Sequence, residues 1–305
     1  MPAAIEVRDL RKVYDGRIVA VDGVSMAVAA GEVYALLGHN GAGKSTTVEI
    51  LEGHRSRTAG EVTVLGVDPA AGGRELRDRI GIVLQSSGIE GSLSVREAVT
   101  VYGSCYSRRR PIEEVLALAG LIDQADQRIA TLSGGQRRRV DLALGIVGYP
   151  EVLFLDEPTT GFDPTARRSA WDVVRRLGAG GTTVVLTTHY LDEAEHLADR
   201  VGVIADGRLI AEGTPAELIG ATSVTVVRVD LPAAHGGDGI ESVLPSEATV
   251  DGRRLEFSTT QPTADVHRLC AWAVERGIEF DALSVRRPSL EDAFLALAGD
   301  EDGAS

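Results

Sequence analysis

Residues 38–46 read Gly-His-Asn-Gly-Ala-Gly-Lys-Ser-Thr, and this segment restricts the possible fold more than any other part of the 305-residue chain. It matches the pattern G-x-x-x-x-G-K-[ST], with an apolar run, Val33–Leu37, before it and a helical stretch from about Ser45 to Gly53 after it. Glycine allows the backbone to turn closely around an anion, and the N-terminus of a helix attracts negative charge. The segment therefore predicts a phosphate-binding loop between a buried strand and a helix.

The residue types in this loop indicate how a nucleotide is held. Lys44 is placed to bind the β- and γ-phosphates, and Ser45 is placed to offer its hydroxyl to Mg²⁺. We expect nucleotide contacts from Gly38, Asn40, Gly41, Gly43, Lys44, Ser45 and Thr46.

A pair of carboxylates stands at the end of another apolar run, Val152–Asp156, which is followed by Glu157. Two charges at the end of a buried strand are costly unless a cation or polar groups compensate them. Asp156 suits Mg²⁺, which it would bind through the water shell that the metal usually keeps. Glu157 suits a base that orients or deprotonates the attacking water. The loop and the carboxylates together predict a nucleoside triphosphatase.

Apolar runs in the first two-thirds of the chain predict further strands at Ile80–Gln85, Thr183–Thr188 and Val201–Asp206. Several of these runs are continuous rather than alternating, which is typical of strands covered on both faces. Because helical stretches separate them, we predict an α/β fold with a mostly parallel sheet. Residues 86–150 have helical apolar spacing and no convincing strand, so we interpret them as an inserted helical subdomain.

The pentapeptide Leu132-Ser133-Gly134-Gly135-Gln136 narrows the class of protein. Ser133 is placed to cap a helix that begins near Gln136, and the two glycines leave backbone N–H groups free for an anion. With the loop before it and Asp156-Glu157 after it, the chain from about Ile5 to Leu218 resembles the ATP-binding cassette of ABC transporters, in which this pentapeptide is the signature motif. The resemblance implies a P-loop ATPase that uses ATP and Mg²⁺.

Four further residues take their roles from this resemblance. Tyr14 stands where the family keeps an aromatic that stacks on adenine, and Gln85 matches a glutamine that contacts Mg²⁺ and water and senses the membrane subunit. Asp163 matches an aspartate at the interface between two cassettes, and His189 matches a switch histidine that contacts the γ-phosphate. The implied catalytic residues are Glu157, His189 and Gln85, and the implied Mg²⁺ site is Ser45, Gln85 and Asp156.

Ser133 follows a helical insertion and cannot easily reach the glycine loop of its own chain. We therefore expect a homodimer that closes head to tail around two ATP molecules. The nucleotide contacts expected from the second copy are Ser133, Gly134, Gly135, Gln136 and Asp163.

The apolar pattern changes near residue 220, so we expect a cassette over residues 1–220 and a second domain over residues 221–305. Ser289, with Asp292 three residues later, is expected to begin the last helix of this domain in an arrangement similar to a capping box. Because the segment has no cluster of His, Cys or carboxylates at ligand spacing, we expect an accessory α+β domain without a catalytic role. Its other expected elements are strands at Val224–Leu231, Arg254–Thr259 and Ile278–Arg286 and a helix at Ala264–Arg276, ended by Gly277.

Composition and charge bear on the partners of the chain. The net charge is -14 and the pI is near 4.9, so we expect no nucleic-acid surface, because phosphate binding needs concentrated Lys and Arg. No run of about 18 apolar residues occurs, so we expect no membrane-spanning helix. Met1–Glu6 lacks the basic start and apolar run of a secretory signal. Transport would therefore need a separate membrane-spanning permease, with this chain peripheral on the cytoplasmic face of the membrane.

Three phrases indicate a branch of the family. Leu132–Val140, Glu157–Gly161 and the ending Pro288–Leu297 resemble the ATP subunits of drug- and antibiotic-export systems, and the daunorubicin/doxorubicin-resistance group in particular. The expected function is ATP-driven efflux of a drug-like or antibiotic-like substrate. Two alternatives stay open: a soluble ABC ATPase outside transport, acting on ribosomes or DNA, and an ATPase whose C-terminal domain senses a regulatory ligand. The acidity and the lack of a second cassette or a long coiled coil disfavour the first alternative.

Overall fold

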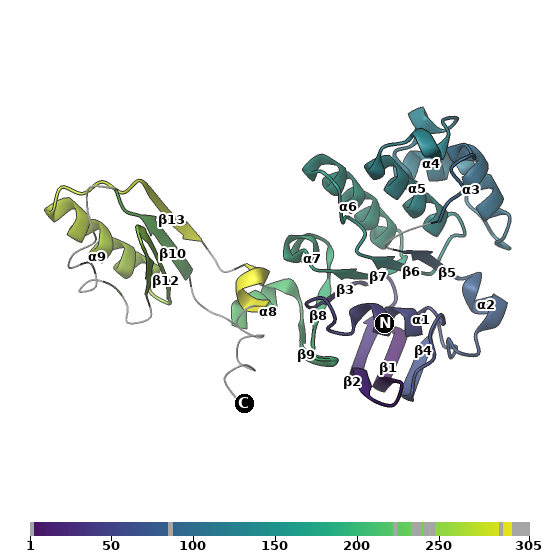
Figure 1. Ribbon diagram of the computed structural model, residues 1–305, viewed down its shortest axis with the longest axis horizontal. Coiled ribbons are helices and arrows are strands. Elements are labelled where there is room, and N and C mark those ends of the chain that lie inside the picture. Colours follow the sequence, from purple (N-terminus) through teal and green to yellow (C-terminus); the bar gives the residue numbers. More distant parts are fainter. Residues whose placement is uncertain are drawn as a thin grey trace. The chain divides into compact units, whose positions relative to one another are not determined.

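The computed structural model describes residues 3–84, 88–221, 225–232, 240, 244, 248–286 and 289–294. The chain forms two compact units, Met1–Pro215 and Ala216–Ser305, and each is described by itself (Figure 1). This division lies slightly before the boundary at residue 220 that the sequence indicates. Helix α8 (Pro215–Ala221) spans it.

A six-stranded sheet forms the centre of the first unit, in the order β5-β6-β7-β3-β8-β9. Neighbouring strands are parallel except for β9, which runs antiparallel to β8. Every residue of β3 and β7 is buried, as expected for continuous apolar strands covered on both faces. The predicted α/β fold with a mostly parallel sheet is confirmed. The strands are β3 (Val33–Leu37), β5 (Ile80–Val83), β6 (Val152–Asp156), β7 (Thr183–Thr188), β8 (Arg200–Ala205) and β9 (Arg208–Gly213).

A second sheet in this unit is antiparallel and was not predicted. Its order is β2-β1-β4, formed by β2 (Ile18–Ala29), β1 (Ala3–Tyr14) and β4 (Ala59–Val64). Helix α1 (Lys44–Leu51) lies between the two sheets (Figure 1), and its Ile50 shares one apolar core with residues of both. The helix that follows the glycine loop is therefore held from two sides.

Helices α6 (Pro164–Ala179) and α7 (Leu191–Leu197) cover the other face of the six-stranded sheet (Figure 1). From residue 88 to residue 150 the regular elements are helical, apart from one isolated bridge between Ser94 and Arg128. These elements are α3 (Val95–Gly103), α4 (Ile112–Ala119), the 3₁₀ turns η1 (Ile122–Gln124) and η2 (Ile129–Thr131), and α5 (Gly134–Ile146); the short α2 (Gly73–Arg77) precedes β5. Among the described helices, none combines the length and the apolar character needed to cross a membrane.

The second unit contains a four-stranded antiparallel sheet in the order β11-β12-β10-β13, with helix α9 (Pro262–Glu275) packed against it. Its core includes Val227, Leu255, Phe257 and Trp272. The strands are β10 (Thr225–Asp230), β11 (Thr249–Asp251), β12 (Arg254–Thr259) and β13 (Ala282–Arg286).

The predicted strand at Ile278–Arg286 is too long at its N-terminal end, since β13 begins only at Ala282. Gly277 adopts a φ of 65° and ends α9, as predicted, and the N–H of Ile278 then donates to the Ala273 carbonyl at 2.9 Å. Ile278 therefore belongs to the end of the helix and to the core. The last predicted helix is described over residues 290–294, and its cap is confirmed: the N–H of Asp292 donates to Ser289 Oγ at 3.3 Å.

The helical part of the first unit packs against β5 through a close glycine contact. A Cβ atom at Gly81 would lie 2.1 Å from the carbonyl oxygen of Gly145 on α5. We expect Gly81→Ala to push α5 away from the sheet and to lower the free energy of unfolding by about 1–3 kcal/mol, the usual cost of overpacking. Urea unfolding measures this, with Gly220→Ala as a control because a Cβ there meets nothing within 4 Å. Equal midpoints for Gly81→Ala and the native chain would contradict this packing.

Candidate active site

The glycine loop between β3 and α1 needs its glycines for two different reasons. A Cβ atom at Gly38 would lie 2.4 Å from the carbonyl oxygen of Ile204, and one at Gly43 would lie 2.4 Å from that of Ala20. Gly41 has open space around it but a φ of 88°, which residues with a side chain rarely adopt. Close packing and backbone conformation together explain the spacing of the three glycines.

Lys44 is the first residue of α1, and its buried side chain folds back over the loop. Its Nζ donates to the carbonyl oxygens of Gly38 at 2.7 Å and His39 at 3.0 Å. Burial lowers the pKa of Lys44, while the charges of Glu157 and Asp156 act in the opposite direction. The ammonium group is therefore fixed where the backbone of the loop turns and faces the carboxylates at the end of β6.

A cavity of about 150 Å³ opens at this loop. It brings together the predicted loop contacts other than Gly38, which lies against β8, and adds Glu157 from the end of β6. Its lining residues are Ala20, Asn40, Gly41, Gly43, Lys44, Ser45, Thr46 and Glu157.

Glu157 and His189, both predicted as catalytic, are in direct contact. The Nδ1 atom of His189 lies 3.1 Å from Glu157 Oε1, and Thr160 Oγ1 donates to Glu157 Oε2 at 3.1 Å. The backbone of Glu157 has a φ of 45°, which is uncommon for a residue with a side chain, and its N–H donates to the Thr187 carbonyl at 3.1 Å. The carboxylate is thus oriented from both oxygens at the edge of the cavity.

The residues at this site fit Mg²⁺ bound together with a nucleotide. Asp156 and Ser45 supply one carboxylate and one hydroxyl, the hard oxygen ligands that Mg²⁺ prefers, while the metal keeps several waters and substrate oxygens. Thr187 Oγ1 donates to Asp156 Oδ1 at 2.5 Å, which fixes that carboxylate at the strand end. Across the described chain, no group of three or more His, Cys, Asp or Glu is arranged to hold a metal by itself.

Tyr14 lies at the end of β1, and its hydroxyl is 3.2 Å from Thr46 Oγ1 in the first turn of α1. Lys12 Nζ and the Arg55 guanidinium lie 5.1 and 5.2 Å from the centre of its ring. The predicted adenine-stacking residue is thus next to the loop, among cations. Gln85 lies outside the described residues.

The signature residues and Asp163 cap helices away from this cavity. Ser133 Oγ accepts from the N–H of Gln136 at 3.2 Å, and Gln136 Oε1 accepts from the N–H of Ser133 at 2.9 Å, so the predicted cap is present. The helix begins at Gly134 rather than near Gln136. Asp163 Oδ1 accepts from the N–H groups of Ala166 and Thr165, each at 2.9 Å, and these bonds lower its pKa. None of these residues lines the cavity at Lys44.

Comparisons with known proteins identify the family. Residues 21–160 match the family model described as ABC transporter, and residues 225–289 match one described as ABC transporter domain-containing protein-like, C-terminal domain. The chain is 41% identical to the daunorubicin/doxorubicin resistance ATP-binding protein of Streptomyces peucetius, over 97% of this chain and 92% of that protein. This chain belongs to the ABC transporter family. It is also 41% identical to the Nod factor export ATP-binding protein I of Rhizobium johnstonii, over 98% of this chain and 96% of that protein.

The ABC cassette is also recognisable in three dimensions. The chain is similar to a dimeric ATP-binding cassette in a post-hydrolysis state with ADP and Pi, with a TM-score of 0.63 and 26% identity over 69% of this chain and 98% of that one. As an ABC cassette, this chain binds and hydrolyses ATP. The cavity between Lys44 and Glu157 is the candidate site for that reaction.

Thr187 and Glu52 are among the residues near this site that sequence reasoning missed. Thr187 contacts both Asp156 and the backbone of Glu157, and its only signal is a hydroxyl inside an apolar strand that ends before His189. Glu52, the C-cap of α1, is buried, and His54 Nδ1 lies 3.3 Å from its Oε2. Burial, with the charges of Asp156 and Glu49, raises the pKa of Glu52 to about 8. Nothing in the sequence distinguishes Glu52 from an ordinary polar helix end.

This shift predicts a pH dependence of stability. The pKa of Glu52 is raised from 4.5 to about 8 in the folded chain. The folded chain therefore binds the proton of the Glu52 carboxyl group more tightly than the unfolded chain does. The resulting contribution to the free energy of unfolding is fully present below pH 4.5 and is lost as the pH rises to about 8. Glu52→Gln should flatten that decline, measured by urea unfolding without nucleotide or Mg²⁺.

The control for this measurement is Glu61→Gln, whose side chain is 80% exposed and which should keep the native decline. If the curves of Glu52→Gln and the native chain run parallel between pH 4.5 and about 8, Glu52 is not the group responsible.

Proposed function

We propose that this chain is the ATP-hydrolysing subunit of an ABC exporter that drives efflux of a drug-like or antibiotic-like molecule. It acts from a peripheral position on the cytoplasmic face of the membrane, and a separate permease supplies the membrane path. The similarity over nearly the full length to a daunorubicin/doxorubicin resistance ATP-binding protein and to a Nod factor export ATP-binding protein supports export. The observation that carries the ATPase chemistry is the cavity in which Lys44 and Glu157 meet.

The residues proposed to act on the nucleotide have distinct parts. Lys44 binds the β- and γ-phosphate oxygens in place of the loop carbonyls that it now contacts. Mg²⁺, held by Ser45 and Asp156, would neutralise charge on the phosphates. Glu157, oriented by Thr160 and His189, takes a proton from the attacking water. Gln85 keeps the role implied by the resemblance, contact with Mg²⁺ and the water, and Tyr14 stacks on adenine.

The proposal includes a homodimer that completes each site. Ser133 and Gln136 hydrogen-bond to each other at the start of α5, and neither residue lines the cavity at the glycine loop of its own chain. A γ-phosphate bound to a second copy suits that N-terminus, because the helix dipole favours negative charge. Residues 221–305 form an accessory unit in this assembly, without a part in the reaction.

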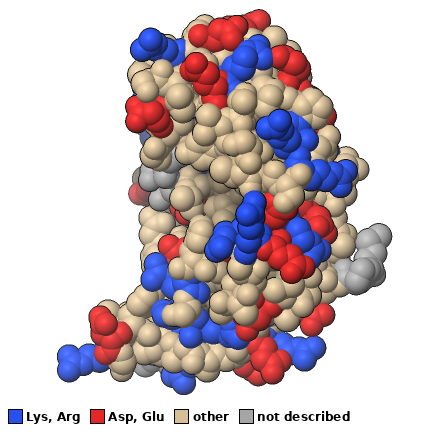
Figure 2. Space-filling model, turned by 90° about the vertical axis from the view of Figure 1, so that its right-hand side faces the viewer, with Lys and Arg blue, Asp and Glu red and all other residues tan. Residues whose placement is uncertain are grey.

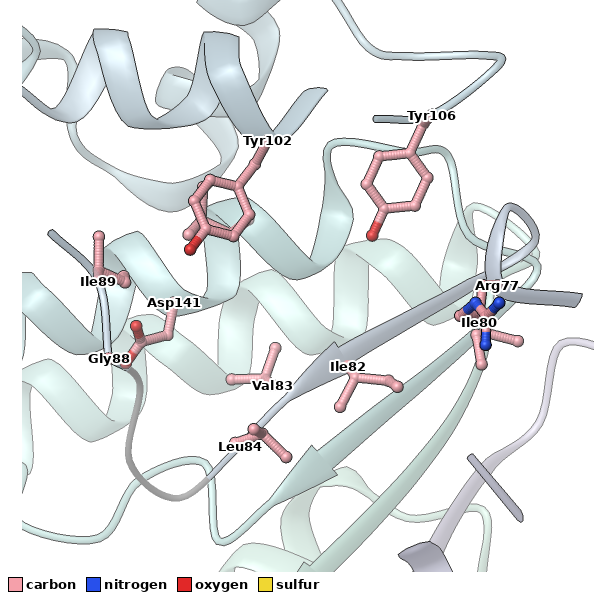
Figure 3. Close-up of a pocket in the computed structure, with 11 residues that line it drawn as sticks. Arg77, Ile80, Ile82, Val83, Leu84, Gly88, Ile89, Tyr102, Tyr106 and Asp141 are labelled. Carbon is pink, nitrogen blue, oxygen red and sulfur yellow. The ribbon is translucent and has the colours of Figure 1, made fainter. Parts of the chain in front are cut away.

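We propose that the permease docks in a groove of about 330 Å³ lined by α2, β5, α3 and α5 (Figure 3). The groove is mainly apolar, and Leu84 and Tyr102 in its lining are 47% and 42% exposed. Figure 2 shows a hollow of uncharged side chains, flanked by charged ones, on the side of the molecule that carries α2 and α3. Gln85, the residue implied to sense the membrane subunit, directly follows Leu84.

Lys44→Ala and Glu157→Gln should fail in different ways. Lys44→Ala removes the charge that binds the phosphates, so the affinity for ATP should fall. Glu157→Gln keeps the shape but removes the base, so binding should survive while turnover falls by roughly 10²–10⁴-fold. Titration with a fluorescent ATP analogue and a phosphate-release assay separate the two effects. In addition, Glu157→Gln with ATP and Mg²⁺ should sediment as a dimer.

Hydrolysis by Glu157→Gln at a near-native rate would show that its role is wrongly assigned. A strictly monomeric profile of the same variant at high protein and ATP concentrations would exclude the proposed homodimer.

The docking proposal is tested by a matched pair of substitutions on α3. Tyr102→Asp places a charge in the groove, whereas Val101→Asp places one on the same helix at a residue that is 52% exposed and does not line the groove. Tyr102→Asp should abolish co-purification of the permease with the tagged chain, and Val101→Asp should retain it. Both isolated variants should keep the native ATPase rate. Equal recovery of the permease with the two variants would place the contact elsewhere.

A further inference from the structure

The buried guanidinium of Arg138 contacts both a residue of the groove in Figure 3 and the backbone of residues 156–158, which include the proposed base. Arg138 is buried on α5 and donates to the carbonyl oxygens of Asp156 at 2.8 Å and of Glu157 and Pro158 at 3.2 Å each. It also donates to the carbonyl oxygen of Leu84, which follows β5. One side chain of the signature helix thus connects the ends of two neighbouring strands of the sheet.

The same guanidinium contacts both sites that the proposed function uses. Its Nη1 lies 3.7 Å from Asp141 Oδ2, and Asp141 and Leu84 both line the groove, where Figure 3 labels them. On its other side, Arg138 holds the backbone of Glu157, whose side chain lines the nucleotide cavity. Arg138 therefore joins two residues of the groove wall to the backbone of the proposed base.

Arginine is suited to this place for a physical reason. Burial lowers the pKa of Arg138, against the opposing charges of Asp141 and Asp156, so the protein carries a desolvated cation here. A planar guanidinium presents five N–H donors in a fixed plane and serves several acceptors at once, whereas a lysine ammonium carries its three N–H donors on one nitrogen. Lysine therefore keeps the charge at this position but cannot keep the set of carbonyl contacts.

We propose that Arg138 is a positioning residue for ATP hydrolysis, which holds the backbone of Glu157 in its left-handed conformation and links it to the groove through Leu84 and Asp141. The inference rests on the proposed function for the role of Glu157. It adds that the groove regulates turnover through this guanidinium.

The test compares Arg138→Lys, Asp141→Asn and the double variant in the purified full-length chain. Arg138→Lys should reduce kcat roughly 10–100-fold, the scale expected when a reacting group is misplaced by about 1 Å. ATP affinity should stay within about twofold, because the loop at Lys44 is untouched. Asp141→Asn should reduce kcat less, and the double variant should be no slower than Arg138→Lys, because Asp141 acts through Arg138.

Arg139→Lys is the matched control. It makes the same substitution at the next residue of α5, where the guanidinium donates to the Gly120 carbonyl at 3.5 Å, and it should leave kcat unchanged. If Arg138→Lys fails to fold, Arg138→Gln replaces it, since an amide keeps two N–H donors and buries no charge. Its expected loss of kcat is the same.

Two results would overturn the inference. One is a lowered unfolding midpoint of the Arg138 variant with native kcat in the folded protein, which would make Arg138 a brace for stability only. The other is a double variant whose loss equals the product of the single losses, which would separate Asp141 from Arg138. Glu157→Gln separates a failure of this inference from a failure of the proposed function. If Glu157→Gln abolishes ATP turnover and Arg138→Lys does not, only the inference on Arg138 fails.

Discussion

The candidate site is built around the electrostatic attraction of buried Lys44 for the carboxylates of Glu157 and Asp156, at one edge of a parallel sheet. Lys44 follows β3 and Asp156 ends β6, and both strands are neighbours of β7. Parallel strands end at the same edge of the sheet, so the loop after β3 and the carboxylates at the end of β6 lie together there, although the helical subdomain separates them in the sequence. Packing of α1 between two sheets then holds the ammonium against the carbonyls of its own loop.

The polar contacts around Glu157 show how this edge is organised for chemistry. Thr187 on β7 holds Asp156 through its hydroxyl and Glu157 through its carbonyl, and His189 follows two residues later to reach the Glu157 carboxylate. A single strand therefore supplies both the support and the partner of the proposed base. Arg138 on α5 likewise donates hydrogen bonds to the carbonyl oxygens at the ends of β5 and β6. The helical subdomain is therefore connected to the site by hydrogen bonds as well as by apolar packing.

Strands were predictable from the sequence where their residues form a continuous apolar run. The continuous apolar strands β3, β6 and β7 were predicted because both faces are buried. The strands β1, β2 and β4 were not predicted, because none of them is a continuous apolar run; in β1, exposed Glu6 and Arg8 flank buried Val7. The end of β5 was predicted to carry Gln85, but that residue lies outside the described chain.

The sequence by itself determined the local features: the glycine loop, the helix cap by Ser133, and the helix cap by Ser289. Such interactions join residues a few positions apart, and their geometry follows from residue type and spacing. Only the tertiary structure decided that His189 contacts Glu157, that Glu52 lies near Asp156 with a raised pKa, and that Arg138 joins two strand ends. Those contacts depend on strand order and on the depth of burial, which no short pattern of residues encodes.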